Sequence, residues 1–361
     1  GYFTAGPSII NIINALGASK FARVIAGYAP DVILCTHVFA AQMVDELKKR
    51  KKLDDIKTIG IVGLGALGTM YAELFTRALG KEHVLVLADR ERTARYRRDG
   101  MWYNGERCDL NYTNAATVTE PVDLLLFTVK FTGLPDAIET CRHLVGPETT
   151  LVSILNGISS EELLCEAFGD EGVVWCVVGK VAAQKEGNRV TMFPVVPPAG
   201  EMDLGVPAGH SRAHLDRLTA FFDSIGFHYC LPENILVTMW SKLLCNVGCN
   251  QAATAYECNY SVLQSPGPAR DTMLSAMREV LTLAHAEGIP LTEEDITMWT
   301  AVIDGITPTN EPSMRQDSKA HRKSEVELFS GTVRRLAQKH HIAVPVNDWL
   351  YETITEMERH Y

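Results

Sequence analysis

The sequence is short of positive charge and of long apolar runs. It has 34 Lys and Arg residues against 44 Asp and Glu, which gives a net charge of −10 at pH 7. Because binding to phosphates needs a basic face, this balance argues against nucleic acid as a partner. No apolar stretch is long enough to span a bilayer, and no basic segment followed by an apolar core opens the chain. We therefore expect no membrane partner, no secretory signal and a cytoplasmic location.

Cysteine patterns typical of metal centres are also missing. None of the nine cysteines lies in a CxxC pair, and none pairs with histidine at zinc-finger spacing. Cys245 and Cys249 are four residues apart without a nearby histidine, and His210 and His214 lack the glutamate of a zincin. We expect reduced thiols, as in a cytosolic protein, and no metal site.

The most informative motif is a glycine-rich turn, IGIVGLGALG, after the apolar run 59–62 and before helical spacing over 69–79. In such a strand–turn–helix the glycines make the turn, admit a pyrophosphate and let the helix pack on the strand. The N–H groups at the helix start then face the phosphates. A plain glycine turn in another αβ unit is the alternative. The expected dinucleotide-binding residues are Gly63, Leu64, Gly65, Ala66, Leu67 and Gly68.

A second apolar strand, 84–88, ends at Asp89 and Arg90, about twenty residues beyond the glycines, where dinucleotide-binding units place an acidic residue. An aspartate there binds the ribose hydroxyls of NAD and repels a 2′-phosphate, whereas an arginine can hold that phosphate. Arg92 and Arg95 follow nearby. We expect Asp89 and Arg90 to contact the cofactor, with NADP favoured and NAD possible.

The pattern of apolar residues divides the chain into three segments. We expect residues 1–55 to form an N-terminal extension, with a strand at 31–36 and then a helix that ends in KKRKK. Because cations are favourable at a helix C-terminus, we interpret this basic run as a solvated helix end and not as a nucleic-acid-binding patch. Residues 56–231 alternate strands and helices, and their continuous apolar strands fit a parallel sheet covered on both faces. Long helical patterns occupy residues 232–361. We expect a Rossmann-type, doubly wound α/β domain followed by an all-α domain.

Within the last two segments the pattern gives individual elements. We expect strands at 123–129, 150–155, 173–178 and 189–193, a Pro- and Gly-rich loop at 194–212, and helices at 214–225, 235–256, 269–286, 293–303, 313–339 and 347–360.

The helix expected at 235–256 is apolar nearly all round and should be buried. Lys242, Asn246 and Asn250 lie at i, i+4 and i+8 and so form a row along one face. A buried lysine is costly without a partner or a purpose, and two carboxamides in the same row can orient a polar ligand. We expect a site on this face; a wet stripe at a domain surface is the alternative.

Four further residues are candidates for the same site. Ser313 begins an S-x-x-Q capping box, and a helix N-terminus can also hold a substrate carboxylate. Glu325 would lie about three turns further along that helix, where a glutamate is usually on the surface. Lys130 and Asn156 follow two of the strands, at the edge where parallel sheets bind ligands, although asparagine before glycine is also a common turn residue.

Together these stretches resemble the ketopantoate reductase (2-dehydropantoate 2-reductase) family, from about residue 56 to the C-terminus. The resemblance implies a Rossmann domain and a helical domain like that of the 6-phosphogluconate dehydrogenases, with the active site between them. It also implies NADPH-dependent reduction of 2-dehydropantoate to pantoate, a step in pantothenate and coenzyme A biosynthesis. The stretches that carry it are IGIVGLGALG, TVKFTG, LNG, WSKLLCNVGCNQAATAY, PSMRQD, KSEVELFSG and HHIAVPVN.

The resemblance implies a role for each candidate. Lys242 would be the general acid, Glu325 would complete the catalytic site, and Lys130 and Asn156 would face the cofactor and the reacting centre. Leu155 replaces the family's frequent glutamine and SEVE replaces its TEID run, but neither change removes a reactive group. The implied substrate-binding residues are Asn246, Asn250, Ser313, Asn310 and Asn156.

Two other functions stay open: reduction of another branched 2-oxo acid, and redox sensing by a non-catalytic NAD(P)-binding protein. The intact Lys242 row argues against sensing, since sensing needs no acid. We expect a small 2-oxo acid as partner and a monomer or homodimer. Residues 1–55 resemble a strand–helix fragment of the N-terminal domain of monogalactosyldiacylglycerol-synthase-like glycosyltransferases. The sugar-nucleotide half of such an enzyme is absent, so no activity follows.

Overall fold

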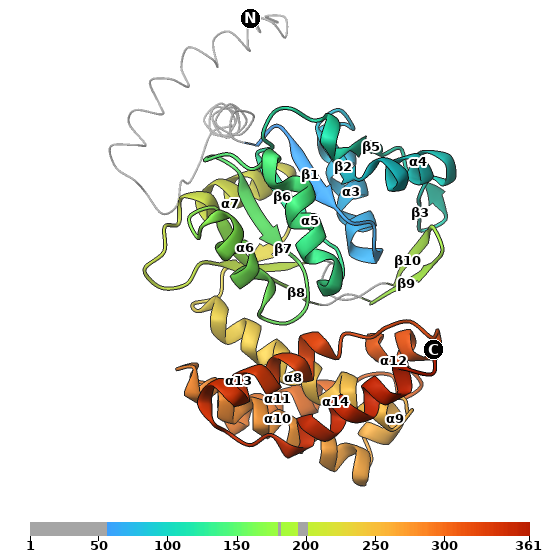
Figure 1. Ribbon diagram of the computed structural model, residues 1–361, viewed down its shortest axis with the longest axis vertical. Coiled ribbons are helices and arrows are strands. Elements are labelled where there is room, and N and C mark those ends of the chain that lie inside the picture. Colours follow the sequence, from blue (N-terminus) through green and yellow to red (C-terminus); the bar gives the residue numbers. More distant parts are fainter. Residues whose placement is uncertain (1–55, 180–181, 194–200) are drawn as a thin grey trace, which may run out of the picture.

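The computed structural model describes residues 56–179, 182–193 and 201–361. Figure 1 shows an α/β region above a helical region, with the C-terminus in the helical region. The strand and helix expected within residues 1–55 lie outside the described residues. Among the residues that are described, no helix is long and apolar enough to cross a membrane.

An eight-stranded sheet forms the centre of the α/β region, in the order β12-β11-β8-β7-β6-β1-β2-β5. The strands from β8 to β5 run parallel, and β11 pairs antiparallel with β8. The strand order reverses between β1 and β6, where doubly wound sheets bind ligands at their carboxyl edge. The strands are β1 (Ile59–Val62), β2 (Val84–Ala88), β5 (Asn111–Asn114), β6 (Leu124–Phe127), β7 (Thr150–Ser153), β8 (Val173–Val178), β11 (Met202–Gly205) and β12 (Tyr229–Cys230).

Helices cover both faces of this sheet, so the expected doubly wound α/β fold is confirmed. One face packs against α3 and α7, where Tyr71, Phe75 and Phe222 are fully buried, and the other packs against α5 and α6. The helices are α3 (Ala66–Leu79), α4 (Arg90–Asp99), α5 (Leu134–Cys141), α6 (Ser160–Phe168) and α7 (Ala213–Ile225), with short 3-10 turns η1 (Ala115–Thr117), η2 (Phe131–Gly133) and η3 (Arg142–Leu144).

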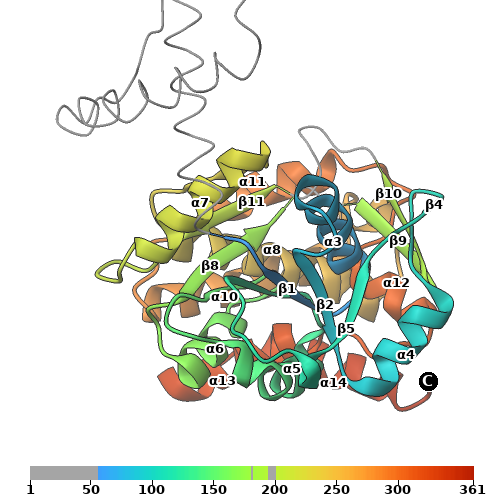
Figure 2. The same ribbon diagram turned by 90° about the horizontal axis from the view of Figure 1, so that it is seen from above.

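A second, four-stranded sheet has the order β4-β3-β10-β9 and lies beside α3 (Figure 2). It joins two hairpins from distant parts of the chain, because β3 and β10 pair in parallel. Its strands are β3 (Trp102–Tyr103) and β4 (Glu106–Arg107), which follow α4, and β9 (Ala182–Glu186) and β10 (Arg189–Phe193), which follow β8. The sheet therefore places the residues of β9 and β10, which follow β8 in the sequence, beside α3.

Helix α8 is the centre of the helical region and packs against α10, α11, α12 and α14. Its buried residues extend around the helix, as its apolar sequence indicates. The helices are α8 (Ile235–Ala255), α9 (Tyr260–Leu263), α10 (Pro268–Ala286), α11 (Glu293–Asp304), α12 (Ser313–Lys319), the π-helical turn η4 (Glu327–Gly331), α13 (Thr332–His340) and α14 (Pro345–Glu358).

Two expected elements are wrong. The single helix expected over 313–339 is broken after Lys319, because His321 adopts φ +50° and Arg322 folds back onto Asp317 through its N–H and its guanidinium. The loop expected over 194–212 contains β11, which pairs with β8. Its apolar side chains are buried, but the prolines and glycines around it hide so short a strand in the sequence.

Candidate active site

Two glycines of the turn are required by the fold itself. Gly63 adopts φ +103°, which favours glycine. A Cβ on Gly68 would lie 2.3 Å from Gly63 O and 2.3 Å from Thr128 Oγ1. Thr128, the residue after β6, donates through Oγ1 to Gly63 O at 2.6 Å and so holds the turn in place. These contacts place the start of α3 tightly against the end of β1.

The fold does not require the third glycine. Gly65 has φ −70°, and the nearest atom to a Cβ there would be Thr128 O at 3.7 Å. Gly65 is the N-cap of α3, which has no side-chain cap and no acidic residue in its first turn. The N–H groups at this helix start are therefore available to an anion. The free N–H groups at the start of α3 and the open space at Gly65 fit the pyrophosphate of a dinucleotide.

Asp89 lies at the end of β2 and caps α4. Its Oδ1 accepts the Arg92 N–H at 2.7 Å, and its Oδ2 lies 3.5 Å from Arg92 Nε. Part of its negative charge is thus balanced within the protein. Arg90 follows as the first residue of α4 and is exposed. The two residues stand together at the carboxyl edge of the sheet, as expected.

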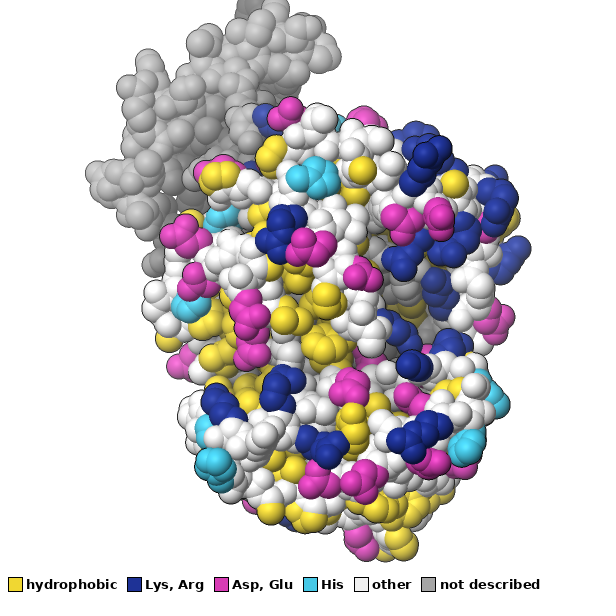
Figure 3. Space-filling model, viewed as in Figure 1, with side chains coloured by type: hydrophobic (Ala, Val, Ile, Leu, Met, Phe, Trp, Pro, Cys, Tyr) yellow, Lys and Arg dark blue, Asp and Glu magenta, His cyan; other side chains and the backbone are white. Residues whose placement is uncertain are grey.

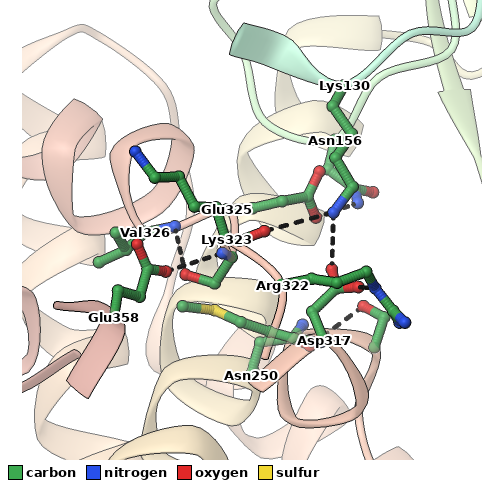
Figure 4. A network of polar contacts seen from close by, with 12 residues as sticks. Lys130, Asn156, Asn250, Asp317, Arg322, Lys323, Glu325, Val326 and Glu358 are labelled. Carbon is green, nitrogen blue, oxygen red and sulfur yellow. Dashed lines mark hydrogen bonds and ion pairs between the residues drawn. The ribbon is translucent and has the colours of Figure 1, made fainter. Parts of the chain in front are cut away.

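Residues from the carboxyl edge of the sheet meet a loop of the helical region (Figure 4). Lys130, after β6, donates to Asp317 Oδ2 at 3.0 Å and to Lys323 O at 3.3 Å. Asn156, after β7, donates to Glu325 Oε2 at 3.0 Å. The structure therefore brings Lys130, Asn156 and Glu325 together between the two regions.

Glu325 lies in the loop before η4, so its expected position on a helix is wrong. Burial raises the pKa of the Glu325 carboxyl, while the hydrogen bond from Asn156 and the charges of Lys130 and Lys242 oppose that rise. A carboxyl with a raised pKa keeps its proton to a higher pH than a surface glutamate does.

Lys242 faces the same space from α8. Its Nζ donates to the carbonyl of Val178, at the end of β8, at 2.6 Å. Burial lowers the pKa of the Lys242 ammonium, and the neighbouring Cys176 thiol and Glu325 carboxyl oppose that shift. A lysine whose pKa lies below its ordinary value is a better proton donor near neutral pH.

The two asparagines of α8 form a chain of hydrogen bonds. Asn250 Oδ1 accepts the Met314 N–H at 3.3 Å and the Ser313 hydroxyl at 3.4 Å. Asn250 Nδ2 donates to Asn246 Oδ1 at 3.1 Å. Asn246 Nδ2 is buried and finds no hydrogen-bond partner among the described residues. Since buried donors are almost always paired, this amide is suited to a ligand one turn from Lys242.

The capping box expected at Ser313 does not form. Pro312 is the N-cap of α12, and Ser313 is its first residue. The Gln316 amide donates to Glu311 O at 2.9 Å instead of capping the helix. Ser313 reaches the row on α8 through its hydroxyl alone.

Asn310 stands apart from the other candidates. It is exposed, and its backbone carbonyl accepts the Tyr260 N–H at 3.1 Å. No hydrogen bond within the described part of the chain joins its side chain to the cluster.

Sequence reasoning missed two residues of the site, Asp317 and Val178. Asp317 accepts a hydrogen bond from Lys130, and the Val178 carbonyl accepts one from Lys242. Asp317 follows Ser313 by one helical turn in PSMRQD, which is the signal that could have found it.

A Rossmann fold whose glycine turn leads into an uncapped helix, facing a helical region with a partly buried lysine, is typical of dinucleotide-dependent oxidoreductases. A family model described as ketopantoate reductase PanE/ApbA matches residues 59–204, and its C-terminal counterpart matches residues 234–358. The chain belongs to the ketopantoate reductase family. A model for monogalactosyldiacylglycerol (MGDG) synthase matches residues 4–63, which confirms the resemblance of the N-terminal segment.

Individual relatives agree with this assignment at low identity. The 2-dehydropantoate 2-reductase of Aquifex aeolicus is 24% identical over 305 residues, covering 82% of this chain and 96% of its own. A D-mandelate dehydrogenase with NADH and anilino(oxo)acetate has a TM-score of 0.74 at 22% identity, covering 84% of this chain and 98% of its own. A dimeric ketopantoate reductase from Staphylococcus aureus has a TM-score of 0.69 at 22% identity, covering 84% and 99%. The structural neighbours establish the fold.

Proposed function

We propose that the protein reduces 2-dehydropantoate to pantoate with NADPH. In this proposal residues 56–231 bind the cofactor and residues 232–361 hold the substrate. The observation that carries it is the buried amide of Asn246, unpartnered among the described residues, one turn from Lys242. The family and the name of the Aquifex aeolicus relative support the choice of substrate.

The reduced nicotinamide, when bound, supplies a hydride to the ketone carbon. Lys242 donates its proton to the ketone oxygen, which becomes the hydroxyl of pantoate, and its charge stabilises the negative charge that grows there. The Val178 carbonyl orients the ammonium. Lys130 and Asn156, at the neighbouring strand ends, face the cofactor and the reacting centre.

Substrate recognition falls to the polar groups around Lys242. Asn246 donates to a substrate oxygen through Nδ2, and Asn250 fixes the orientation of that amide. Glu325 holds the substrate hydroxyl, and Ser313 contacts the carboxylate. A weaker contact from Asn310 completes the proposed set.

NADP is the proposed cofactor. Asp89 would repel a 2′-phosphate, but its carboxylate already caps α4 and lies beside Arg92. Arg90, exposed at the start of α4, can hold that phosphate. The remaining repulsion is therefore smaller than the sequence alone indicates.

A second candidate is the reduction of another 2-oxo acid with NADH. The fold neighbour described as D-mandelate dehydrogenase with NADH favours it. NADPH and NADH oxidation should be measured with 2-dehydropantoate, with smaller branched 2-oxo acids and with phenylglyoxylate. The largest kcat/KM should belong to 2-dehydropantoate with NADPH. Cofactor binding without turnover of any of these acids would favour redox sensing instead.

A variant pair tests the substrate contacts. Asn246→Ala should raise the KM for 2-dehydropantoate by about tenfold, the weight of one hydrogen bond to a charged or reacting oxygen, and leave NADPH affinity unchanged. Asn310→Ala, outside the hydrogen-bonded cluster, should change KM less.

Because the Staphylococcus aureus relative is described as dimeric, we also propose that this protein forms a homodimer. Light scattering would measure its mass in solution.

A further inference from the structure

The loop that carries Glu325 is held from two sides. Residues 320–326 lie between α12 and η4 and belong to no helix. On the side of the sheet, Asn156 donates to Glu325 Oε2 at 3.0 Å. Figure 4 shows Glu358, the last residue of α14, on the other side of this loop. A helix that carries none of the candidate residues therefore contributes to the position of Glu325.

Two hydrogen bonds fix the backbone around Glu325. Glu358 Oε1 accepts the Ser324 N–H at 2.7 Å, across 34 positions of the sequence. The Ser324 hydroxyl oxygen accepts the Val326 N–H at 3.2 Å. An irregular segment without such bonds keeps many backbone conformations, and ordering it costs free energy. Glu325 thus lies between two residues whose N–H groups are held, and Glu358 supplies the first of these bonds.

The bond from Ser324 also offsets an unfavourable position of Glu358 on its own helix. The C-terminal end of a helix dipole is negative, so a carboxylate in the last turn is disfavoured there. Glu356, in the same turn, pairs with Arg359. Glu358 is half-buried and accepts a backbone N–H from another part of the chain instead. A hydrogen bond to an ionised acceptor is stronger than one between neutral groups, so this contact is suited to hold the loop.

We propose that Glu358 is a positioning residue, which holds Ser324 so that the Glu325 carboxyl meets Asn156 and the substrate hydroxyl. The proposal rests on the proposed function, in which Glu325 binds a 2-oxo acid between the two regions. Figure 3 shows the surface hollowed between these regions, with Lys and Arg side chains around the hollow. Glu358 touches neither substrate nor cofactor and acts through the backbone of the loop. Without its bond to Ser324, the loop gains other conformations, and the apparent affinity for the substrate falls with the share of the competent one.

Steady-state kinetics with 2-dehydropantoate test this role. Glu358→Ala should raise the KM by about tenfold, the weight of one hydrogen bond to a charged group, and leave kcat and NADPH affinity near wild type. Glu358→Gln keeps an oxygen that accepts the Ser324 N–H, so its KM should stay within about threefold of wild type. Glu352→Ala, an exposed change on the same helix, should leave the KM unchanged. An unchanged KM with a lower kcat in Glu358→Ala would indicate a loss of folded enzyme and no positioning role.

A double-mutant cycle shows whether Glu358 acts through Glu325. In an enzyme that already carries Glu325→Ala, Glu358→Ala should raise the KM by less than about twofold, because no carboxyl remains to be positioned. Ser324→Ala removes the acceptor for the Val326 N–H and should raise the KM in the same direction, so the cycle can be run with it if Glu358→Ala does not fold. Equal increases in the two backgrounds, or a wild-type KM in Glu358→Ala, would overturn the proposal.

Hydrogen exchange tests the contact in the absence of substrate. Amides in a peptide covering residues 320–326 should exchange about tenfold faster in Glu358→Ala than in wild type, because the Ser324 N–H has lost its partner. Glu352→Ala should exchange like wild type. Unchanged exchange in Glu358→Ala would show that Glu358 does not hold the loop. If exchange is faster but the wild-type enzyme fails to reduce 2-dehydropantoate, the proposed substrate is wrong while the contact with Ser324 stands, and the KM cycle is run with the 2-oxo acid that is reduced.

Discussion

The amide of Asn156 donates to Glu325 Oε2 at 3.0 Å, a contact between residues 169 positions apart in the sequence. Lys130 and Asp317 make a parallel contact across the same boundary, at 3.0 Å. The first joins the carboxyl edge of the sheet to the loop before η4, and the second joins the same edge to α12. The position of Glu325 relative to Lys242 is therefore set by contacts between the two regions and not by one helix.

The general acid is the first target for a test. Lys242→Met keeps most of the apolar stem and removes the charge, so turnover with 2-dehydropantoate should fall by at least about a hundredfold, the typical contribution of a general acid. NADPH affinity should stay near wild type, because the glycine turn sets it. Stopped-flow kinetics and a cofactor titration give the two values.

Lys319→Met is the matched control, since Lys319 is an exposed lysine of α12 paired with Glu311 at 3.0 Å. Its turnover should equal that of wild type. Turnover near wild type in Lys242→Met would exclude this lysine as the acid. Glu325 would then be the next candidate.

The pH dependence of the reaction tests whether Glu325 acts on the pKa of Lys242. Reduction needs a protonated Lys242, so kcat/KM should fall as pH rises through the pKa of Lys242, which burial lowers from the ordinary lysine value of about 10.4. The negative charge of Glu325 raises the pKa of Lys242, so Glu325→Gln should move this basic limb to lower pH. A basic limb at the wild-type pH would show that Glu325 does not act on the acid.

Much of the fold could be predicted because it depends on local pattern. Strands β1, β2, β8 and β10 have the expected bounds, since each is a short run of strand-forming residues next to turn signals. The row of Lys242, Asn246 and Asn250 follows from helix geometry alone. These features need no knowledge of what packs against them.

The remainder depends on contacts between distant residues. Nothing local marks the end of α12, because the polar residues after Lys319 contain neither proline nor glycine, and the chain turns there through Arg322 and Asp317. The pairing of Lys130 with Asp317 spans 187 positions and leaves no periodic signal. The unpartnered amide of Asn246, among the described residues, likewise became visible only from the hydrogen bonds that Asn250 makes in the folded chain.

The glycine turn offers a test that separates binding from folding. Gly65→Ala meets no atom closer than 3.7 Å at its new Cβ, so its thermal stability should stay near wild type while NADPH affinity falls at least about tenfold. Gly68→Ala should instead lower the melting temperature, because its Cβ would lie 2.3 Å from Gly63 O. Scanning fluorimetry and cofactor titration distinguish the two. Unchanged affinity in Gly65→Ala would contradict a pyrophosphate at this turn.

Cofactor choice can be tested without disturbing α4. Asp89→Asn keeps a side-chain oxygen for the cap and removes the charge, so it should improve NADPH binding relative to NADH. Arg90→Ala should weaken NADPH binding selectively, by about tenfold. Selective loss of NADH binding in Arg90→Ala would reverse the assignment of these two residues.

The last prediction concerns Glu161, a fully buried residue of α6. The Ser160 hydroxyl donates to its Oε2 at 2.8 Å, and its Oε1 has no hydrogen-bond partner among the described residues. Burial raises the pKa of Glu161 to about 7, against an ordinary value of about 4.3. The folded protein therefore binds more protons than the unfolded chain between these two pH values.

Because the folded state holds the extra proton, the free energy of unfolding should fall as pH rises from about 4.3 to about 7, by at most on the order of 3 kcal/mol. Glu161→Gln should remove this part of the pH dependence. Any other effect of the substitution on the free energy of unfolding should be the same at both pH values. Urea denaturation at pH 5 and pH 8 gives the difference for wild type and variant. Glu166→Gln, an exposed change on the same helix, should keep the wild-type difference. An equal difference in wild type and Glu161→Gln would show that Glu161 is ionised in the folded protein throughout this range.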